Sequence, residues 1–360
     1  MTTPRGKVAL FFGTRPQVIK ASVLRDALAA VTDVVTVDTG QHYDYALHQV
    51  HYDQLGVAAP DAYLGIGSGT HANQTAAILT AAAEWIRQHR PRAAVVIGDT
   101  NSTLACALAA AKERVPVAHV EAGLRAKDVL MAEEINRRCV DAIASFLFAP
   151  SERAEQTLRR ERADGEIHRV GDVAYDVLRR AMSRAPSPVV NGEYVYATLH
   201  RAELVDDPLL LRDVMSALGG LPLPVLFAAH PRTTQALQRA GCKPERGVRM
   251  CEPLGYLESV AAIRGASAVV TDSGGIQREA YWMGIPCVTV RTETEWSETV
   301  ECGANRLVSP KASGDLAAAV AAAVTTRPSR WNVTHYGDGR AAERIAAVLA
   351  EGRLGANSSS

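Results

Sequence analysis

The sequence lacks the marks of several large protein classes. Its six cysteines are scattered without a C-x-x-C pair, which argues against a disulfide framework or a zinc site and favours buried free thiols. No apolar run approaches the ~18 residues of a membrane span, and no charged-then-apolar leader precedes the first predicted strand. Lys+Arg and Asp+Glu both total 39, so no overall charge attracts nucleic acid or a membrane surface. We therefore expect a cytoplasmic protein.

Two nucleotide-binding fingerprints are also missing. The first β/α junction, Phe11–Lys20, has one glycine where a dinucleotide-binding turn has three. The chain contains no G-x-x-x-x-G-K-[ST] motif, which is the mark of an ATP-binding P-loop. These absences argue against NAD, FAD and ATP as ligands.

What the 360 residues do contain is a regular alternation of short apolar runs and helical patterns. Such runs, each followed by a helix, are typical of a parallel sheet covered on both faces. Strands are predicted at Val8–Phe12, Val34–Asp38, Ala94–Ile97, Val117–Val120, Phe146–Ala149, Ile167–Val170, Tyr194–Leu199, Val225–Ala229, Val248–Cys251, Ala268–Thr271 and Cys287–Val290. The pattern indicates an α/β fold with two doubly wound, Rossmann-like domains.

A Pro/Ser/Gly-rich stretch without periodicity divides the alternation into two halves. We place an N-terminal domain at residues 1–181, a linker at 182–192 and a C-terminal domain at 193–338. A helix with an apolar stripe follows at 339–352 and could pack back on the first domain. The polar tail, 353–360, is expected to be disordered. Two such domains with an interdomain cleft are the economical interpretation.

Four carboxylates stand at the mouths of consecutive β/α units in the first half. Asp99 follows the apolar run Ala93–Ile97, Glu121 follows the next run, and Glu133 and Glu134 come shortly after. Open α/β sheets bind their ligands where parallel strands end. Crowded carboxylates repel one another, so we expect the pKa of at least one to rise and leave an acid beside a base. This arrangement suits proton transfer on a bound substrate.

Structural roles remain open for some of these carboxylates. Asp99 could cap the helix that follows it, and Glu133–Glu134 could merely favour the positive end of the next helix. Glu121 is harder to explain structurally, because a charge directly after a buried strand is costly without a partner.

A candidate anion site lies in the second half, where a β-branched strand leads into Ser273-Gly274-Gly275 and a helix begins. The glycines expose backbone N–H groups and the helix dipole favours negative charge, so a phosphate or diphosphate fits. Glu279, one turn into the helix, is within reach of a ribose. An ordinary tight turn with a serine cap is the alternative. Arg15, beside the first helix N-terminus, is either a second anion ligand or a surface residue.

Three histidines follow predicted strands. His200 and Arg201 end the first strand of the second half, His230 ends the next, and Gln41-His42 ends a strand of the first half. A histidine at the carboxyl edge of a sheet can serve as an acid or a base. Helix capping or loop packing explains His230 equally well.

Ten segments occur in one order from residue 13 to about residue 308: GTRPQVIK, TGQHYD, GDTNSTLA, HVEAGLR, EEINRR, VGDVAYD, LHRAE, HPR, TDSGGIQREA and GIPCVTVRTETEW. In these segments the sequence resembles the non-hydrolysing UDP-N-acetylglucosamine 2-epimerase family. The resemblance implies a fold of the glycosyltransferase-B type that holds a UDP-sugar in its interdomain cleft. It also implies a homodimer formed through the first domain and chemistry that needs no metal or redox cofactor.

The resemblance further implies residue roles. The catalytic residues would be Asp99, Glu121, Glu133 and His200. The substrate contacts would be Arg15, Lys20, Arg201, His230, Ser273, Gly274, Gly275, Glu279 and Arg291. Parts of a second, activating sugar-nucleotide site match Gln41, His42, Glu134 and His230.

The reaction that the resemblance implies begins with removal of the C2 proton and anti-elimination of UDP. Re-addition of UDP to the resulting 2-acetamidoglucal then inverts C2. The main prediction is therefore conversion of UDP-N-acetylglucosamine to UDP-N-acetylmannosamine.

Departures from the family pattern leave alternatives open. Gln17 replaces a glutamate, Leu204 replaces an asparagine, Ser259 stands where an apolar residue often packs near the uracil, and an arginine expected within Ser68–Gln74 is absent. One alternative is an epimerase, or a hydrolysing epimerase, for a modified UDP-N-acetyl sugar. A glycosyltransferase of the same fold and a nucleotide-sugar-binding protein without turnover are the others.

Overall fold

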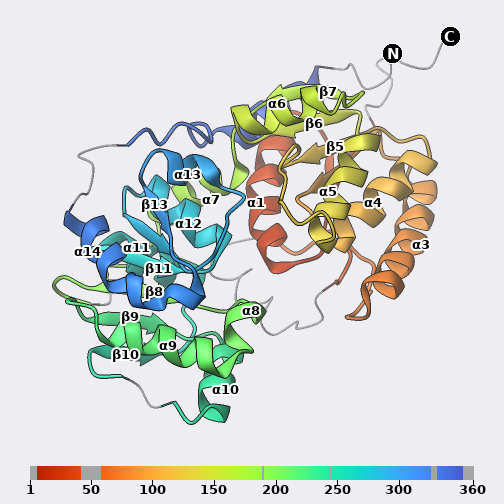
Figure 1. Ribbon diagram of the computed structural model, residues 1–360. Coiled ribbons are helices and arrows are strands. Elements are labelled where there is room, and N and C mark those ends of the chain that lie inside the picture. The colour runs from red at the N-terminus through yellow and green to blue at the C-terminus, as the bar shows by residue number, and fades with distance from the viewer. Residues whose placement is uncertain (1–5, 42–57, 189, 243–244, 326–330, 352–360) are drawn as a thin grey trace. The chain divides into compact units, whose positions relative to one another are not determined.

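The computed structural model describes residues 6–41, 58–188, 190–242, 245–325 and 331–351 (Figure 1). The chain divides into two compact units. Unit 1 takes the described residues up to Arg179 and those from Thr334 onward, and unit 2 takes those from Arg180 to Val333. Each unit has one parallel sheet with alternating helices, so the predicted pair of Rossmann-like α/β domains is confirmed.

The sheet of unit 1 has the strand order β3-β2-β1-β4-β5-β6-β7, and all its pairs are parallel. Its strands are β1 (Val8–Phe12), β2 (Val34–Asp38), β3 (Ala62–Tyr63), β4 (Ala93–Ile97), β5 (Val117–Val120), β6 (Phe146–Ala149) and β7 (Glu166–Arg169). Its helices are α1 (Arg15–Ala29), α3 (His71–His89), α4 (Asn101–Lys112), α5 (Ala132–Ile143), α6 (Glu152–Arg160), α7 (Val173–Met182), which crosses the unit boundary, and α15 (Ala341–Ala350). The strand order reverses between β1 and β4, and such switch points are where doubly wound sheets bind ligands.

The sheet of unit 2 has the order β10-β9-β8-β11-β12-β13, again all parallel. Its strands are β8 (Val195–Thr198), β9 (Val225–Ala228), β10 (Val248–Cys251), β11 (Ala268–Thr271), β12 (Cys287–Thr289) and β13 (Asn305–Leu307). Its helices are α8 (Ala202–Val205), α9 (Pro208–Gly219), α10 (Pro231–Arg239), α11 (Tyr256–Gly265), α12 (Gly274–Trp282), α13 (Ser297–Glu301) and α14 (Leu316–Thr325), with a 3₁₀ segment at Pro310–Asp315. Here the switch point lies between β8 and β11.

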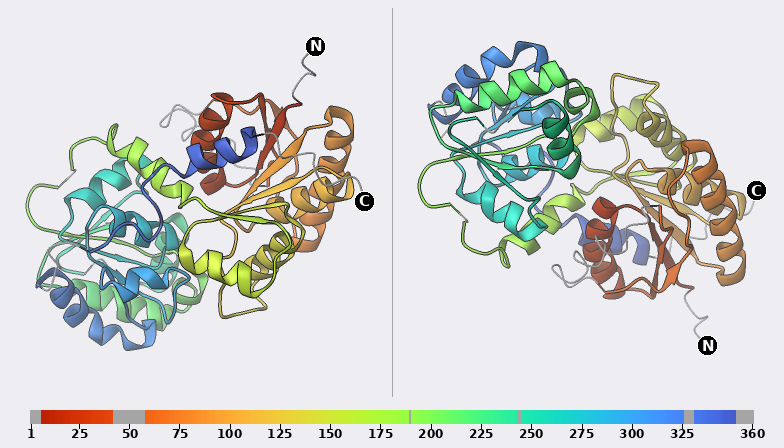
Figure 2. Two further views of the ribbon diagram at one scale, coloured as in Figure 1. Left: turned by 90° about the horizontal axis from the view of Figure 1, so that it is seen from above. Right: turned by 90° about the horizontal axis from the view of Figure 1, so that it is seen from below.

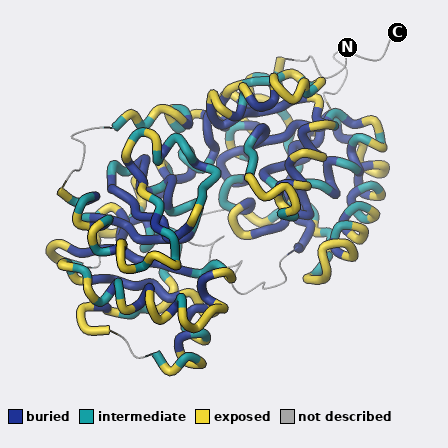
Figure 3. The backbone as a smooth tube through the Cα atoms, in the orientation of Figure 1, coloured by how far each residue is buried: buried dark blue, intermediate teal, exposed yellow. Residues whose placement is uncertain are grey.

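The core of each unit follows from the apolar strands. Every residue of β1 and β4 is buried, because helices cover both faces of the sheet (Figure 3). The Ala-rich helix α4 buries small side chains against this sheet. Leu204, where the family has an asparagine, is 2% exposed and belongs to the apolar core of unit 2. That position serves packing in this chain.

Two strands were not predicted. β3 and β13 comprise two and three residues at sheet edges, which is too short for a periodic pattern. The other strands lie within two residues of their predicted ends.

The last helix, α15, packs beside α1 in unit 1 (Figure 2). Asp176 on α7 accepts hydrogen bonds from the backbone N–H groups of Ala341 and Ala342 at the start of α15. The predicted disordered tail lies outside the described residues.

All six cysteines are free, and Cys106 and Cys287 are buried. Cys139 is exposed, so the expectation of buried thiols is wrong at that position. Among the described helices, none combines the length and apolarity needed to cross a bilayer. The described ranges also contain no group of three or more His, Cys, Asp or Glu residues arranged to hold a metal ion.

Candidate active site

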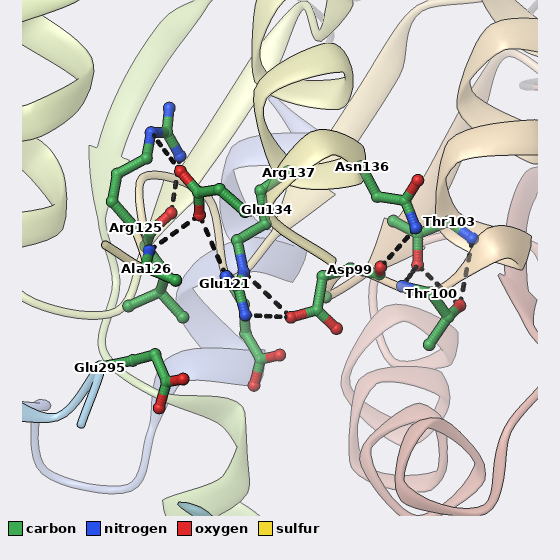
Figure 4. Close-up of polar contacts among 12 residues, drawn as sticks. Asp99, Thr100, Thr103, Glu121, Arg125, Ala126, Glu134, Asn136, Arg137 and Glu295 are labelled. Carbon is green, nitrogen blue, oxygen red and sulfur yellow. Dashed lines mark hydrogen bonds and ion pairs between the residues drawn. The ribbon is translucent and has the colours of Figure 1, made fainter. Parts of the chain in front are cut away.

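Asp99 follows β4 at the switch point of unit 1 and is not the cap of α4. Thr100 is the cap, because its hydroxyl accepts a hydrogen bond from Thr103 N. The Asp99 carboxylate instead accepts from Arg137 Nη2 at 2.5 Å and Nε at 2.9 Å (Figure 4). Its side chain remains 30% exposed. Asp99 is thus held in place by a guanidinium while part of it stays open to a ligand.

Glu121 comes directly after β5 and lies against the same edge. Its backbone is in the left-handed region at φ +71°, and its Oε1 is 2.5 Å from Lys20 Nζ. Its Oε2 lies 3.1 Å from the position that a Cβ on Gly98 would occupy. Gly98 is itself at φ +67°, so glycine suits this position through both its conformation and its contact.

The two carboxylates therefore have separate cationic partners. The Arg137 and Lys20 pairs provide positive charge that was not predicted from the sequence at these positions. Lys20 and Glu121 are nearly buried, with exposed side-chain fractions of 14% and 8%. Desolvated ion pairs of this kind hold their geometry but cost free energy when one partner is removed.

Glu133 and Glu134 differ sharply although they are adjacent. Glu134 is fully buried and accepts hydrogen bonds from Ala126 N at 2.8 Å, Arg138 Nε at 2.8 Å and Arg137 Nη1 at 3.1 Å (Figure 4). Glu133 is exposed and makes no hydrogen bond or ion pair with the residues that the structure describes. Glu134 therefore anchors its loop, and Glu133 is available to a ligand.

Arg137 joins these groups and was missed in the sequence. It contacts Asp99 and Glu134 from one guanidinium, and burial, which lowers its pKa, is outweighed by these carboxylates, which raise it. Asn136 beside it donates to the Asp99 carbonyl at 2.8 Å. The i to i+3 spacing of Glu134 and Arg137 was the only signal, and it does not indicate Asp99.

A buried histidine under the same edge was also missed. His119 on β5 is 0% exposed, with Nδ1 2.7 Å from Asp141 Oδ1 and Nε2 2.8 Å from the Gly98 carbonyl oxygen. Burial raises the pKa of Asp141, but His119 and Arg125 together lower it by more than burial raises it, so the net shift is downward. Both ring nitrogens of His119 are therefore occupied by partners inside unit 1.

Gln17, a departure from the family pattern, forms hydrogen bonds that connect the turn after β1 with the end of β4 at the switch point. Its Oε1 accepts from Gly13 N at 2.9 Å and Thr14 N at 3.1 Å. Its Nε2 donates to the Ile97 carbonyl at 2.7 Å and reaches Thr100 Oγ1 at 2.9 Å. A carboxylate could not donate to a carbonyl, so the amide fits this buried position.

Two of the residues predicted for the second, activating sugar-nucleotide site form hydrogen bonds within unit 1. Gln41 is buried, and its Oε1 accepts from Ser102 Oγ at 2.6 Å and Ser102 N at 3.0 Å. Glu134 is saturated as described above. His42 lies outside the described residues. Gln41 and Glu134 thus have partners inside unit 1, and their part in a second site stays a prediction.

In unit 2 the N-terminus of α12 has the character of an anion site. Ser273 occupies the cap position, but its side chain makes no capping hydrogen bond. The first N–H groups of a helix have no partner within it, so those following Ser273 remain for a ligand. A Cβ on Gly274 would lie 3.0 Å from Trp296 Nε1, whereas one on Gly275 would meet only Ser273 Oγ at 3.8 Å. Ser273 therefore does not cap α12 through its side chain, and the anion site stays a prediction.

Two other predicted substrate contacts in unit 2 have partners nearby. Burial raises the pKa of Glu279 on α12, and Arg278 and Tyr256 offset this only in part. Arg291 is 7% exposed and forms two 3.1 Å hydrogen bonds with Glu295. A ligand that contacts Arg291 meets a guanidinium already paired with a carboxylate.

His200 lies just beyond β8 with a side chain 40% exposed. Its Nδ1 is 3.1 Å from Oδ1 of Asp272, and the other carboxylate oxygen accepts from His200 N and Arg201 N, both at 2.8 Å. Burial raises the pKa of Asp272, but the nearby His200 side chain and the backbone N–H groups of His200 and Arg201 lower it below the ordinary value. Asp272 was not predicted, although it precedes Ser273 in the quoted TDSGG segment.

His230 and Arg15 complete the predicted set. His230 is exposed and caps α10, with Nδ1 accepting from Arg232 N at 3.2 Å, so its capping role is confirmed. Its ring centroid is 6.0 Å from that of His200. Arg15 is exposed at the first position of α1.

Known proteins share this architecture. A family model described as UDP-N-acetylglucosamine 2-epimerase matches residues 26–350. A UDP-2,3-diacetamido-2,3-dideoxy-D-glucuronate 2-epimerase of Pseudomonas aeruginosa is 41% identical over 96% of this chain and 99% of that protein. The crystal structure of Methanocaldococcus jannaschii UDP-GlcNAc 2-epimerase in complex with UDP-GlcNAc and UDP matches with a TM-score of 0.87 and 36% identity, covering 96% of this chain and 100% of that one. A calicheamicin glycosyltransferase matches at TM-score 0.61 and 16% identity over 97% of this chain and 100% of that one, which concerns the fold alone.

Proposed function

Because the chain belongs to the UDP-N-acetylglucosamine 2-epimerase family, we propose that it inverts C2 of a UDP-2-acetamido sugar. UDP-N-acetylglucosamine is the first substrate to test, with UDP-N-acetylmannosamine as product. The observation that carries the proposal is the placement of Asp99 and Glu121 together at the switch point of unit 1, each oriented by its own cation. Two carboxylates at one sheet edge supply two groups that can exchange protons with a bound substrate.

Proton transfer at C2 falls to the carboxylates of unit 1. Asp99 is partly exposed and held by Arg137, so it is suited to accept the C2 proton. Glu121, beside Lys20, is suited to return a proton on the other face of the intermediate. The exposed Glu133 is the third candidate for an exchangeable proton. Inversion needs two proton-transfer groups because the proton leaves one face and returns to the other.

Departure of UDP between these two proton transfers falls to unit 2. The free N–H groups at the start of α12, with Ser273, stabilise the charge that develops on the diphosphate. His200 ends the neighbouring strand and exchanges a proton with the bound substrate. The family resemblance implies that Arg15 offers a further cation for the diphosphate.

The test is incubation of the pure protein with UDP-N-acetylglucosamine in D₂O, followed by proton NMR. Deuterium at C2 and a new anomeric signal are expected, with UDP returned to the sugar. Stoichiometric free UDP would indicate a hydrolysing epimerase instead. A requirement for an acceptor would indicate a glycosyltransferase, and UDP binding without any turnover would indicate a binding protein.

A modified sugar is the second candidate. The Pseudomonas aeruginosa relative is named as acting on a UDP-2,3-diacetamido glucuronate, and it is 41% identical. That sugar also carries an acetamido group at C2, so the same proton transfers apply. The ratio of kcat/KM for the two sugars, measured in parallel, decides between them.

We also propose that the protein works as a homodimer in the cytoplasm. The family resemblance implies the dimer, and six free cysteines suit a reducing compartment. Light scattering coupled to gel filtration tests the dimer, and a monomeric mass would contradict it.

A further inference from the structure

We infer that Asp272 is the positioning residue for His200, and that it holds this histidine with Nδ1 protonated and Nε2 free for proton exchange. The inference deepens the proposed function and depends on His200 taking part in it. Nothing in the segment pattern assigned a role to Asp272.

The first support is the place of Asp272 at the switch point of unit 2. β8 and β11 are parallel neighbours, with Thr198 opposite Thr271, so His200 and Asp272 follow at one sheet edge. Asp272 Oδ2 accepts from His200 N and Arg201 N, which fixes the turn that carries the histidine. Both oxygens of this single carboxylate therefore face the same two residues.

The second support is the geometry around the imidazole. Nδ1 lies 3.1 Å from Asp272 Oδ1. The Asp272 side chain is only 1% exposed, and two backbone amides already stabilise its charge, so it stays ionised and acts only as an acceptor. Oδ1 forms no hydrogen bond with the described residues, and His200 Nδ1 lies 3.1 Å from it outside hydrogen-bond geometry. An ionised oxygen at this distance repels the lone pair of an unprotonated nitrogen, so the contact favours a hydrogen on Nδ1.

The third support is that the other ring nitrogen is left open. Within the described part of the chain, no hydrogen bond to His200 Nε2 occurs. The nearest ring is that of His230, with centroids 6.0 Å apart. A 40% exposed histidine with Nε2 open can meet a ligand atom, whereas a fully bonded one cannot.

Asp272 is also next to the anion site along the chain. Asp272 is followed by Ser273, whose backbone N–H donates to Thr271 Oγ1 at 3.0 Å. The start of α12 and the His200 turn therefore share one rigid attachment. A diphosphate seated on α12 would meet a histidine whose position is already set, which is the basis of pre-organised catalysis.

The experiment begins with the wild-type protein and needs no variant. Nitrogen-15 spectra of labelled histidine distinguish the two neutral tautomers, and we expect His200 in the Nδ1–H form. In Asp272→Asn the amide oxygen can still accept from the two backbone N–H groups, but its NH₂ would face Nδ1. We therefore expect the tautomer to switch to Nε2–H.

The kinetic consequence should appear in kcat. A histidine held in the wrong tautomer costs about 10²–10⁴-fold in kcat, while UDP affinity should stay within about 3-fold because α12 is untouched. In a protein that already carries His200→Gln, Asp272→Asn should lower kcat by less than about a further 3-fold, because both changes remove the same function.

Asp207→Asn is the matched control, since Asp207 also accepts two backbone N–H groups, from Leu209 and Leu210 at the start of α9. It should leave the His200 spectrum and kcat unchanged. An Nε2–H tautomer in the wild type, an unchanged His200 spectrum in Asp272→Asn, or independent multiplying losses in the double variant would overturn the inference. Failure of the proposed function would show differently, as no C2 exchange by the wild type with either sugar while the tautomer result stands.

Discussion

Among the residues that the structure describes, each unit has a buried aspartate paired with a histidine, and the two pairs differ in what surrounds them. In unit 1, His119 and Asp141 are 0% and 4% exposed, and Nε2 of the histidine is bonded to the Gly98 carbonyl. In unit 2, His200 is 40% exposed and Asp272 is 1% exposed. Both histidines direct Nδ1 toward a carboxylate, at 2.7 Å as a hydrogen bond in unit 1 and at 3.1 Å as an ion-pair contact in unit 2.

The difference teaches that the second nitrogen decides the role. His119 has both nitrogens bonded and no access to solvent, so it can only hold strand ends together. His200 keeps one nitrogen for a ligand. A histidine–aspartate pair therefore indicates proton transfer only when one ring nitrogen is open.

The largest expected effect is on the turnover number, at the pair His200–Asp272, whose histidine has one ring nitrogen open (the open pair). His200→Gln should lower kcat by about 10²–10⁴-fold, because a positioned acid or base typically contributes that much. The free energy of unfolding should change by less than about 1 kcal/mol, since the side chain is partly exposed. Steady-state kinetics and urea unfolding measure the two. Wild-type kcat in this variant would remove the basis of the comparison.

The buried pair His119–Asp141 (the sealed pair) should affect stability instead of turnover. His119→Gln removes two buried hydrogen bonds, to Asp141 and to the Gly98 carbonyl, and should lower the free energy of unfolding by about 2–4 kcal/mol. Urea unfolding of this variant beside His200→Gln gives the contrast. If both variants lose similar stability, the distinction between a structural pair and an open one is wrong.

Gly98 links the sealed pair to the carboxylates, because its carbonyl accepts from His119 and its Cα lies against Glu121. Gly98→Ala places a Cβ 3.1 Å from Glu121 Oε2 at φ +67°. We expect a loss of about 1–3 kcal/mol in stability and lower kcat. Thermal unfolding and kinetics test this. Gly314→Ala is the control, because no atom lies within 4 Å of its Cβ position and it should change neither quantity.

The smallest expected effect concerns a third aspartate, which has no histidine partner. Burial raises the pKa of Asp176 to about 6, although the N–H groups of Ala342 and Ala341 oppose this, whereas histidines lower the pKa of Asp141 and Asp272. Because the pKa of Asp176 is higher in the folded protein than in the unfolded chain, folding favours the protonated form. The contribution of Asp176 to the free energy of unfolding is therefore fully present below pH ~4 and is lost as pH rises through about 6.

Unfolding at several pH values measures this contribution. From pH 4 to pH 7 the free energy of unfolding of the wild type should fall by roughly 1–3 kcal/mol relative to that of Asp176→Asn, whose side chain does not titrate. A stability difference that stays constant across this range, or that changes in the other direction, would contradict the assignment.

Much of this arrangement was predictable. Apolar runs located the strands, and the rule that parallel sheets bind ligands at their carboxyl ends singled out Asp99, Glu121, His200 and Ser273. The partners of these residues were not predictable in the same way. Arg137 is 38 residues from Asp99 along the chain, and Asp272 is 72 from His200. No local pattern pairs residues at such separations.

The sequence by itself determined the two α/β units, because buried strands need apolar side chains and turns at strand ends need glycines and polar residues. Only the tertiary structure decided which charges became ligands of one another. It made Glu134 a buried anchor and left its neighbour Glu133 exposed, and it sealed His119 while leaving His200 open. The physical reason is that burial and hydrogen bonding depend on segments far apart in the chain, which the fold alone brings together.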